Sequence, residues 1–193
     1  MCNSQQMIIL KTSKGRVIHE REGELEGADF RGLELHGVNL REQKIVGCDF
    51  SRAGMSSANL EDADARNAIF DDANMQGLFA YSACFDGASF LRTDLYYSDL
   101  FMSSFCQANL SEAQLQGADL KECNFRGAML CQADLGLDNL GGATSLQGAD
   151  FSEADVRGAI WTGAVYDEKT IFPKGFYPEK HGLVFRASSP HRY

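Results

Sequence analysis

A large apolar residue recurs at every fifth position from Leu25 to Leu140, and only Ala65 and Ala80 interrupt the series. A fixed period of this kind constrains the fold strongly, because every repeat must occupy an equivalent place in the structure. Two residues before each large residue lies a small one, most often alanine. Asp or Asn commonly lies between them, as in Ala58-Asn59-Leu60.

A period of five fits neither an α-helix nor a straight strand. On a helix the large positions would scatter around the whole axis, and on a strand residues five apart would lie on opposite faces. Both objections disappear if the chain bends once in every five residues. Four bends close a square coil of about 20 residues, and successive coils stack at the strand spacing of about 4.8 Å. The sequence therefore predicts a quadrilateral β-solenoid, with the small and large residues inside and the other three facing water.

The tandem pattern Ala-(Asp/Asn)-(Leu/Phe)-x-x resembles that of the pentapeptide-repeat family over about residues 21–166. The resemblance implies an all-β fold, a right-handed quadrilateral parallel β-helix of about seven coils. It implies little about function, because members of the family are mostly uncharacterised and rarely enzymes. We expect an N-terminal cap over residues 1–20, the pentapeptide-repeat β-solenoid over 21–166, and a C-terminal cap and tail over 167–193.

Both ends of the chain depart from the repeat. Two apolar runs, Met7–Leu10 and Val17-Ile18, flank a predicted turn and favour a hairpin over the first coil, with a short helix as the alternative. The tail, rich in rings and interrupted by Pro173 and Pro178, should fold back over Trp161. This ending resembles the short tails of many cyanobacterial pentapeptide-repeat proteins.

Residues 20 apart should form vertical columns inside the coil. Two columns are rich in phenylalanine, which predicts ladders of rings along the axis. The repeat frame then slips by one residue between Leu140 and Phe151. We interpret the slip as a bulge at a corner, with a binding feature as the alternative. The columns are Phe30, Phe50, Phe70, Phe90, Leu110 and Leu130; Leu25, Ile45, Ala65, Phe85, Phe105 and Phe125; Leu35, Met55, Met75, Leu95, Leu115 and Leu135; and Leu40, Leu60, Ala80, Leu100, Leu120 and Leu140.

The formal net charge of -9 is concentrated in the repeats. Residues 47–100 carry nine acids against three bases, whereas the segment from 167 onward carries three acids against five bases. An acidic wall argues against direct binding to nucleic acid or to an anionic membrane. The chain lacks an apolar stretch of transmembrane length and a signal pattern, so we expect a cytoplasmic protein with reduced cysteines.

The sequence shows no pattern that indicates catalysis, and we expect neither an enzyme nor a cofactor or metal site. The four histidines are scattered, and no cysteine or histidine spacing suits zinc. The densest acidic group lacks the glycine and terminal glutamate of a calcium loop, although cation binding there is an alternative. The histidines are His19, His36, His181 and His191, and the acidic group is Glu61, Asp62, Asp64, Asp71 and Asp72.

One set of outward positions is unusually apolar, whereas other outward positions are mainly Asp, Asn, Gly, Ser and Gln. It has two interpretations. It is either a cross-coil ladder that stiffens a weak spot where Ala80 underfills the core, or a docking patch for a protein partner. The set, our candidate protein-binding patch, comprises Phe79, Tyr81, Leu91, Tyr96, Tyr97, Phe101 and Met102.

Two classes of function follow from this reading. We favour a non-enzymatic structural or adaptor module that binds a protein partner through its walls or ends, as a monomer or an end-to-end dimer. The alternative, implied by the family resemblance, is a mimic of duplex DNA that binds or protects DNA gyrase or another topoisomerase. Gyrase-protecting members have more degenerate repeats and a dimerising C-terminal helix, to which a tail broken by Pro173 and Pro178 is poorly suited.

Overall fold

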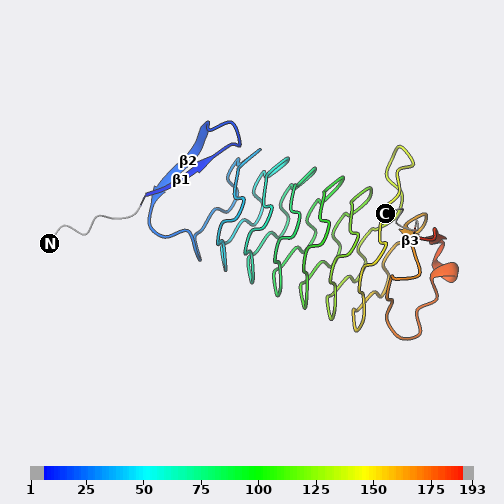
Figure 1. Cartoon of the computed structure of the whole chain (residues 1–193). Coiled ribbons are helices and arrows are strands. Elements are labelled where there is room, and N and C mark those ends of the chain that lie inside the picture. The colour runs from blue at the N-terminus through cyan, green and yellow to red at the C-terminus, as the bar shows by residue number, and fades with distance from the viewer. Residues whose placement is uncertain (1–6, 189–193) are drawn as a thin grey trace, which may run out of the picture.

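The computed structural model describes residues 7–188 as a rod of stacked coils with a distinct segment at each end (Figure 1). Regular strands occur only at these ends, while the coils between them consist of short turns and single bridges. The named elements are β1 (Met7–Lys11), β2 (Val17–Glu22), β3 (Val165–Tyr166), the 3₁₀ helix η1 (Pro178–His181) and β4 (Val184–Phe185).

Parallel pairing between residues 20 apart builds the rod. Asp29 pairs with Asp49, which in turn pairs with Ile69, and the same relation holds in all four columns of bridge residues. Each column contains seven paired residues, which corresponds to seven coils. The predicted fold class, a right-handed quadrilateral parallel β-helix, is confirmed. The solenoid pairing continues beyond residue 166, where the sequence placed its end, since Ile171 pairs with Asp150. Pro173 then prevents a regular continuation of this strand.

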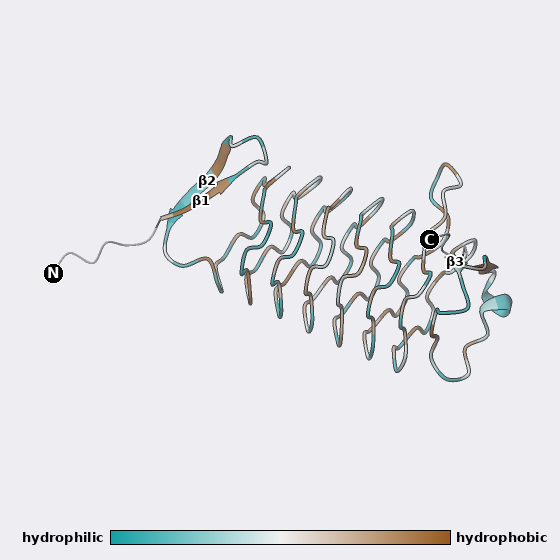
Figure 2. Ribbon diagram, viewed as in Figure 1, coloured by the Kyte–Doolittle hydropathy of each residue, from teal (hydrophilic) through white to brown (hydrophobic). Residues whose placement is uncertain are grey.

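The corners of the regular coils are turns with the same hydrogen bond. The Ala53 N–H donates to the Phe50 carbonyl over 3.0 Å, and Arg52 between them has a φ of 60°. The next backbone contacts run between coils, as where the Phe50 N–H donates to the Ile69 carbonyl over 2.7 Å. A bend in each quintet thus satisfies the backbone and turns two of its five side chains inward. Figure 2 shows the resulting alternation of polar and apolar segments within the coils.

Two ladders of phenylalanine rings fill the core, as predicted. In the first, Phe70 stacks on Phe50 at 5.3 Å and on Phe90 at 4.9 Å between ring centroids. In the second, Phe125 stacks on Phe105 and on Phe151, each at 4.9 Å. The ladders meet edge to face, which is a favourable geometry for aromatic pairs. All of these rings are fully buried.

Ala80 does not leave the core underfilled, because a large residue occupies the small position beside it. Leu78 lies two residues earlier, and both side chains have no exposed surface. The chain has exchanged the large and small positions of this quintet, so the volume of the layer is maintained.

Polar residues at small inward positions are satisfied by the coil before them. Thr93 Oγ1 donates to the Phe70 carbonyl over 2.7 Å, and Ser98 Oγ donates to the Met75 carbonyl over 3.2 Å. Cys123 Sγ contacts the Leu100 carbonyl in the same way, and burial raises the pKa of this thiol. These buried side chains therefore hold neighbouring coils together.

The interruption after Leu135 is six residues long, so the interpretation as a single extra residue was wrong. Asp119 pairs with Ser145, 26 positions later, and Leu146 rather than Leu140 continues the column after Leu120. Leu140 is 86% exposed. Six extra residues shift a five-residue frame by the same amount as one, so periodicity alone does not distinguish them. The excursion is a small loop, closed by an antiparallel bridge between Leu137 and Ala143.

The segments at the two ends cover the first and last coils. β1 and β2 pair in an antiparallel hairpin, and the Asn39 N–H of the first coil donates to the Lys11 carbonyl over 2.7 Å. At the other end Phe176 packs edge to face against buried Trp161, with centroids 5.4 Å apart. β4 then pairs in parallel with β3 and adds one more layer to the wall that contains Val165.

Candidate functional site

Six of the seven residues of the candidate patch lie on one wall of the rod or at its two corners, and we call this wall the Phe79 face. Its bridge residues Asn59, Phe79, Asp99 and Asp119 follow one another on successive coils. The coil that carries Asp99 places Tyr97 at the corner before the wall and Phe101 at the corner after it. Outward side chains therefore cross the face from one corner to the other.

The corner after the Phe79 face contains three members of the patch. The rings of Tyr81 and Phe101 lie on adjacent coils with centroids 5.7 Å apart and a tilt of 30°. The Tyr81 hydroxyl donates to Met102 Sδ over 3.6 Å. Met102 has a φ of 60°, a strained conformation for a residue with a side chain, and remains 46% exposed.

The corner before the face contains Tyr96 and Tyr97, whose rings meet edge to face at 4.6 Å. The ring of Tyr97 lies over Gly117 on the next coil, where an added Cβ would approach Tyr97 Cδ1 to 2.9 Å. Only glycine at position 117 accommodates both this close approach and a φ of 72°. Tyr97 therefore packs closely against the wall at Gly117 and still remains 46% exposed.

The excursion after Leu135 packs against the corner that contains Tyr96 and Tyr97. The Asn139 N–H donates to the Tyr96 hydroxyl over 2.6 Å. The Asp138 carboxylate accepts the Leu140 and Gly142 N–H groups over 2.7 and 2.6 Å, which holds the loop in shape. The hydrogen bond to Asp138, followed by desolvation, raises the pKa of Tyr97 to about 12. Desolvation raises the pKa of Asp138, but hydrogen bonds from Tyr97 and the backbone outweigh it and keep that pKa below its ordinary value.

Leu91 does not belong to this surface, and its inclusion in the patch was wrong in geometry. It follows Phe90, and its carbonyl accepts the Asp72 N–H over 2.9 Å at the corner diagonally opposite Tyr81 and Phe101. The remaining six residues, Phe79, Tyr81, Tyr96, Tyr97, Phe101 and Met102, lie on the Phe79 face and its two corners.

The acidic group that the sequence placed together is dispersed over different walls, and most of its members pair with arginine. Glu61 binds Arg41 at 2.8 Å, and Asp64 binds Arg66 at 2.7 Å. Within residues 7–188, no cluster of three or more His, Cys, Asp or Glu side chains has the geometry to hold a metal ion. The interpretation of this group as a cation site therefore has no geometric support in the described part of the chain.

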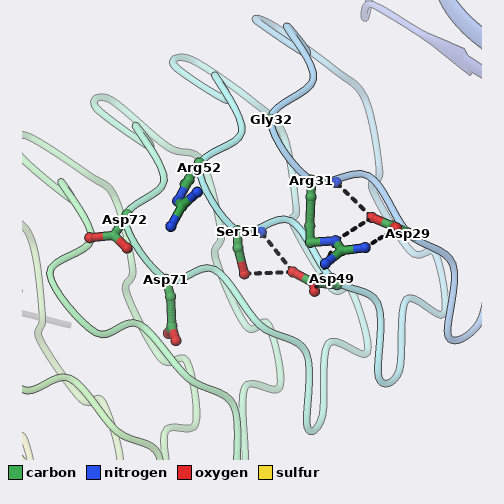
Figure 3. Close-up of a pocket in the computed structure, with 8 residues that line it drawn as sticks. All are labelled: Asp29, Arg31, Gly32, Asp49, Ser51, Arg52, Asp71 and Asp72. Carbon is green, nitrogen blue, oxygen red and sulfur yellow. Dashed lines mark hydrogen bonds and ion pairs between the residues drawn. The ribbon is translucent and has the colours of Figure 1, made fainter.

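A hollow of about 620 Å³ lies at another corner, between the first coils (Figure 3). Arg31 pairs with Asp29 at 2.6 Å and approaches Asp49 to 3.5 Å, and the Ser51 hydroxyl donates to Asp49 over 2.5 Å. The Arg31 guanidinium holds the pKa of Asp29 well below its usual range. Arg31, Asp29, Asp49 and Ser51 bind one another, so these four side chains have little hydrogen-bonding capacity left for a ligand.

Asp99 is the residue of this surface that sequence reasoning missed. It is an exposed carboxylate directly beside Phe79 on the next coil, and it lies between Tyr97 and Phe101 in the chain. The signal was present, since residues 79 and 99 differ by one full coil. Hydrophobicity alone does not point to it, because Asp99 is the charged residue among the apolar outward ones.

Comparisons with known proteins identify the repeat. The sequence profile described as pentapeptide repeats matches in eight copies, over residues 34–72, 48–90 and 98–136. No curated protein matches the chain. No helix within residues 7–188 has the length and apolar character needed to cross a membrane.

Several solved structures are similar. A pentapeptide repeat protein of Nostoc Pcc 7120, alr5209, is 31% identical, with coverage of 53% of this chain and 84% of its own, and a TM-score of 0.37. HetL of Nostoc sp. strain PCC 7120, a pentapeptide repeat protein involved in heterocyst differentiation regulation, is 22% identical, with coverage of 84% and 82% and a TM-score of 0.36. QnrB1, a plasmid-mediated fluoroquinolone resistance protein, is 18% identical, with coverage of 70% and 83% and a TM-score of 0.34.

Proposed function

The chain belongs to the pentapeptide-repeat family, and from this premise we propose that it is a non-enzymatic adaptor that binds a protein partner through the Phe79 face. The observation that carries the proposal is the gathering of six apolar or aromatic side chains on one wall and its two corners. Phe79, Tyr81 and Tyr97 remain 49%, 41% and 46% exposed. Tyrosine, phenylalanine and methionine are enriched at protein interfaces, where they provide large contact areas.

The packing of the core favours the interpretation of these residues as a docking patch over the interpretation as a cross-coil ladder. In the ladder interpretation the rings compensate for space left by Ala80, but Leu78 fills that layer. The rings of Tyr81 and Phe101 still contact one another and contribute to stability. Their exposure, however, is not explained by a defect in the core.

Serine substitutions at Phe79, Tyr81 and Phe101 test the proposal. Tyr96 is kept, because its hydroxyl anchors the excursion. Leu91→Ser on the diagonal corner is the matched control. We expect affinity capture from the source cell, quantified by mass spectrometry, to lose a specific partner with the triple variant and to retain it with Leu91→Ser.

The triple variant is also unfolded in denaturant, so that lost folding is separated from lost binding. Unchanged capture combined with reduced stability would support the ladder interpretation and refute the adaptor. A folded variant that no longer captures the partner supports the adaptor.

Mimicry of duplex DNA toward a topoisomerase is the second candidate, and the acidic rod is the observation that favours it. Local pairing weakens this candidate, because Arg66, Arg92 and Arg157 each neutralise a nearby aspartate on the wall. A gyrase supercoiling assay with and without a quinolone tests it. Inhibition or protection at micromolar protein would favour the mimic. The cytoplasmic location expected from the sequence stays a prediction.

A further inference from the structure

We propose that the Phe79 face receives an arginine-bearing basic segment of its protein partner, with the guanidinium lying against the exposed rings and pairing with Asp99. This inference rests on the proposed adaptor function and specifies the chemistry of the partner. It is carried by the position of one carboxylate among the rings.

The outward positions next to Asp99, on the preceding coil and on both sides along its own coil, are aromatic. Phe79 lies beside it on the preceding coil, and Tyr97 and Phe101 flank it along its own coil, all on outward positions. One carboxylate oxygen accepts the Phe101 N–H over a long 3.3 Å. The other oxygen makes no hydrogen bond within residues 7–188, so it is free to accept one from a bound molecule.

Two other carboxylates on this side of the rod, Asp119 and Glu61, are paired with cations, whereas Asp99 is not. On the next coil Asp119 binds Lys121 at 2.6 Å, and on the corner two coils earlier Glu61 binds Arg41 at 2.8 Å. Over residues 7–188, no lysine, arginine or histidine lies within ion-pair distance of Asp99. Asp99 therefore leaves an uncompensated negative charge in the middle of the apolar surface.

An entirely apolar partner does not fit this arrangement. Covering Phe79, Tyr97 and Phe101 would remove Asp99 from water and leave its charge buried without a counterion, which is strongly unfavourable. A cation on the partner removes this cost. The surrounding acidic wall, with nine acids against three bases in residues 47–100, also attracts a basic segment.

The rings favour arginine over lysine. A guanidinium is planar and weakly hydrated, stacks on aromatic faces, and can donate two hydrogen bonds to one carboxylate. An ammonium group is compact and strongly hydrated, so it gains less from the rings. The combination of exposed rings and a free carboxylate is therefore complementary to an arginine side chain.

The test uses the full-length protein and a fluorescein-labelled peptide of alternating arginine and glycine as the probe, with binding measured by fluorescence anisotropy. The comparison peptides replace arginine by lysine or by citrulline, which keeps the shape of arginine but removes its charge. We expect the arginine peptide to bind about threefold to tenfold more tightly than the lysine peptide. The citrulline peptide should bind more weakly than both.

Asp99→Asn is compared with the double variant Asp119→Asn with Lys121→Gln, one coil away on the same side of the rod. Asp99→Asn should weaken binding of the arginine peptide by about threefold to tenfold, because it removes the free charge. Asp119→Asn combined with Lys121→Gln removes a pair of opposite charges and leaves the net charge unchanged, so it should change binding by less than about twofold. Equal binding of the arginine and lysine peptides, equal effects of the two variants, or no binding by the parent protein would overturn the proposal.

Two further measurements show whether something other than an arginine-bearing segment occupies the Phe79 face. If the Phe79, Tyr81 and Phe101 variant loses its captured partner while Asp99→Asn retains it, the adaptor function stands and the arginine proposal fails. If sedimentation shows self-association that Asp99→Asn abolishes, a second copy occupies the face and the proposal is likewise overturned.

Discussion

Replacing Leu78 by alanine tests whether the exchange of large and small positions maintains the core. The Leu78 side chain is fully buried, and its neighbour at the central position, Ala80, is equally buried. Truncation would therefore leave two adjacent alanines in one layer of a thin core. We expect a loss of about 3–5 kcal/mol in the free energy of unfolding, the range measured for buried leucine truncations that leave a cavity.

The reverse substitution supplies the other half of the test. Ala80→Leu in the presence of Leu78 should overpack the layer and cost about 1–3 kcal/mol. Combining Leu78→Ala with Ala80→Leu restores the ordinary repeat and conserves volume, so the double variant should lie within about 1.5 kcal/mol of the parent. The two positions are then strongly coupled in a double-mutant cycle.

Guanidinium unfolding followed by far-ultraviolet circular dichroism measures all four proteins. The reasoning would be refuted if Leu78→Ala lost less than about 1 kcal/mol, since that is below any cavity-forming leucine truncation. It would also be refuted if the double variant were no more stable than Leu78→Ala alone. Either result would mean that Leu78 does not fill the space beside Ala80.

Three further predictions concern a ring of the core and two ionisable groups. Phe70→Ala should cost about 3–5 kcal/mol, because its ring is stacked between two others; an unchanged melting midpoint would contradict this. Tyrosine absorbance should show one group, Tyr97, titrating near pH 12, and Asp138→Asn should return it toward its ordinary range. Because the folded pKa of Tyr97 is raised, its contribution to stability is present below the ordinary value of 10.0 and is lost as the pH rises through about 12. Hydrogen bonds from Arg157 lower the pKa of Asp155 below its ordinary value of 3.8. The contribution of Asp155 to the free energy of unfolding is therefore present above pH 3.8 and is lost on further acidification. Asp155→Asn should flatten the decline in stability between about pH 5 and about pH 2, and an identical decline in the variant and the parent would argue against this pairing.

Much of the surface could be predicted by counting along the chain. Positions 79 and 99, and positions 81 and 101, differ by one coil, and this spacing correctly placed the contact between Tyr81 and Phe101. The same count shows that residue 91 is half a coil away from 81 and 101. Its inclusion in the patch came from grouping outward residues by hydrophobicity without assigning them to corners.

Other features depended on the coordinates. The ion pairs of the wall join side chains within one quintet or across coils, as Lys121 joins Asp119 and Arg41 joins Glu61. Whether a given carboxylate has a cation beside it therefore depends on the conformations of the long side chains, which the repeat does not specify. Asp99 acquired its significance only from this comparison with its neighbours.

The sequence by itself determined the square coil, its columns and its ladders of rings. These follow from the alternation of small and large residues every five positions, which is sufficient to say which side chains face inward. The tertiary structure alone decided the length of the excursion around Leu140. Insertions that differ by five residues leave the repeat in the same frame, so the periodic pattern does not distinguish one extra residue from six. The tertiary structure also decided the support of Tyr96 and Tyr97 by Asp138 and Asn139, since contacts between a loop and a distant coil depend on the path of the chain in space.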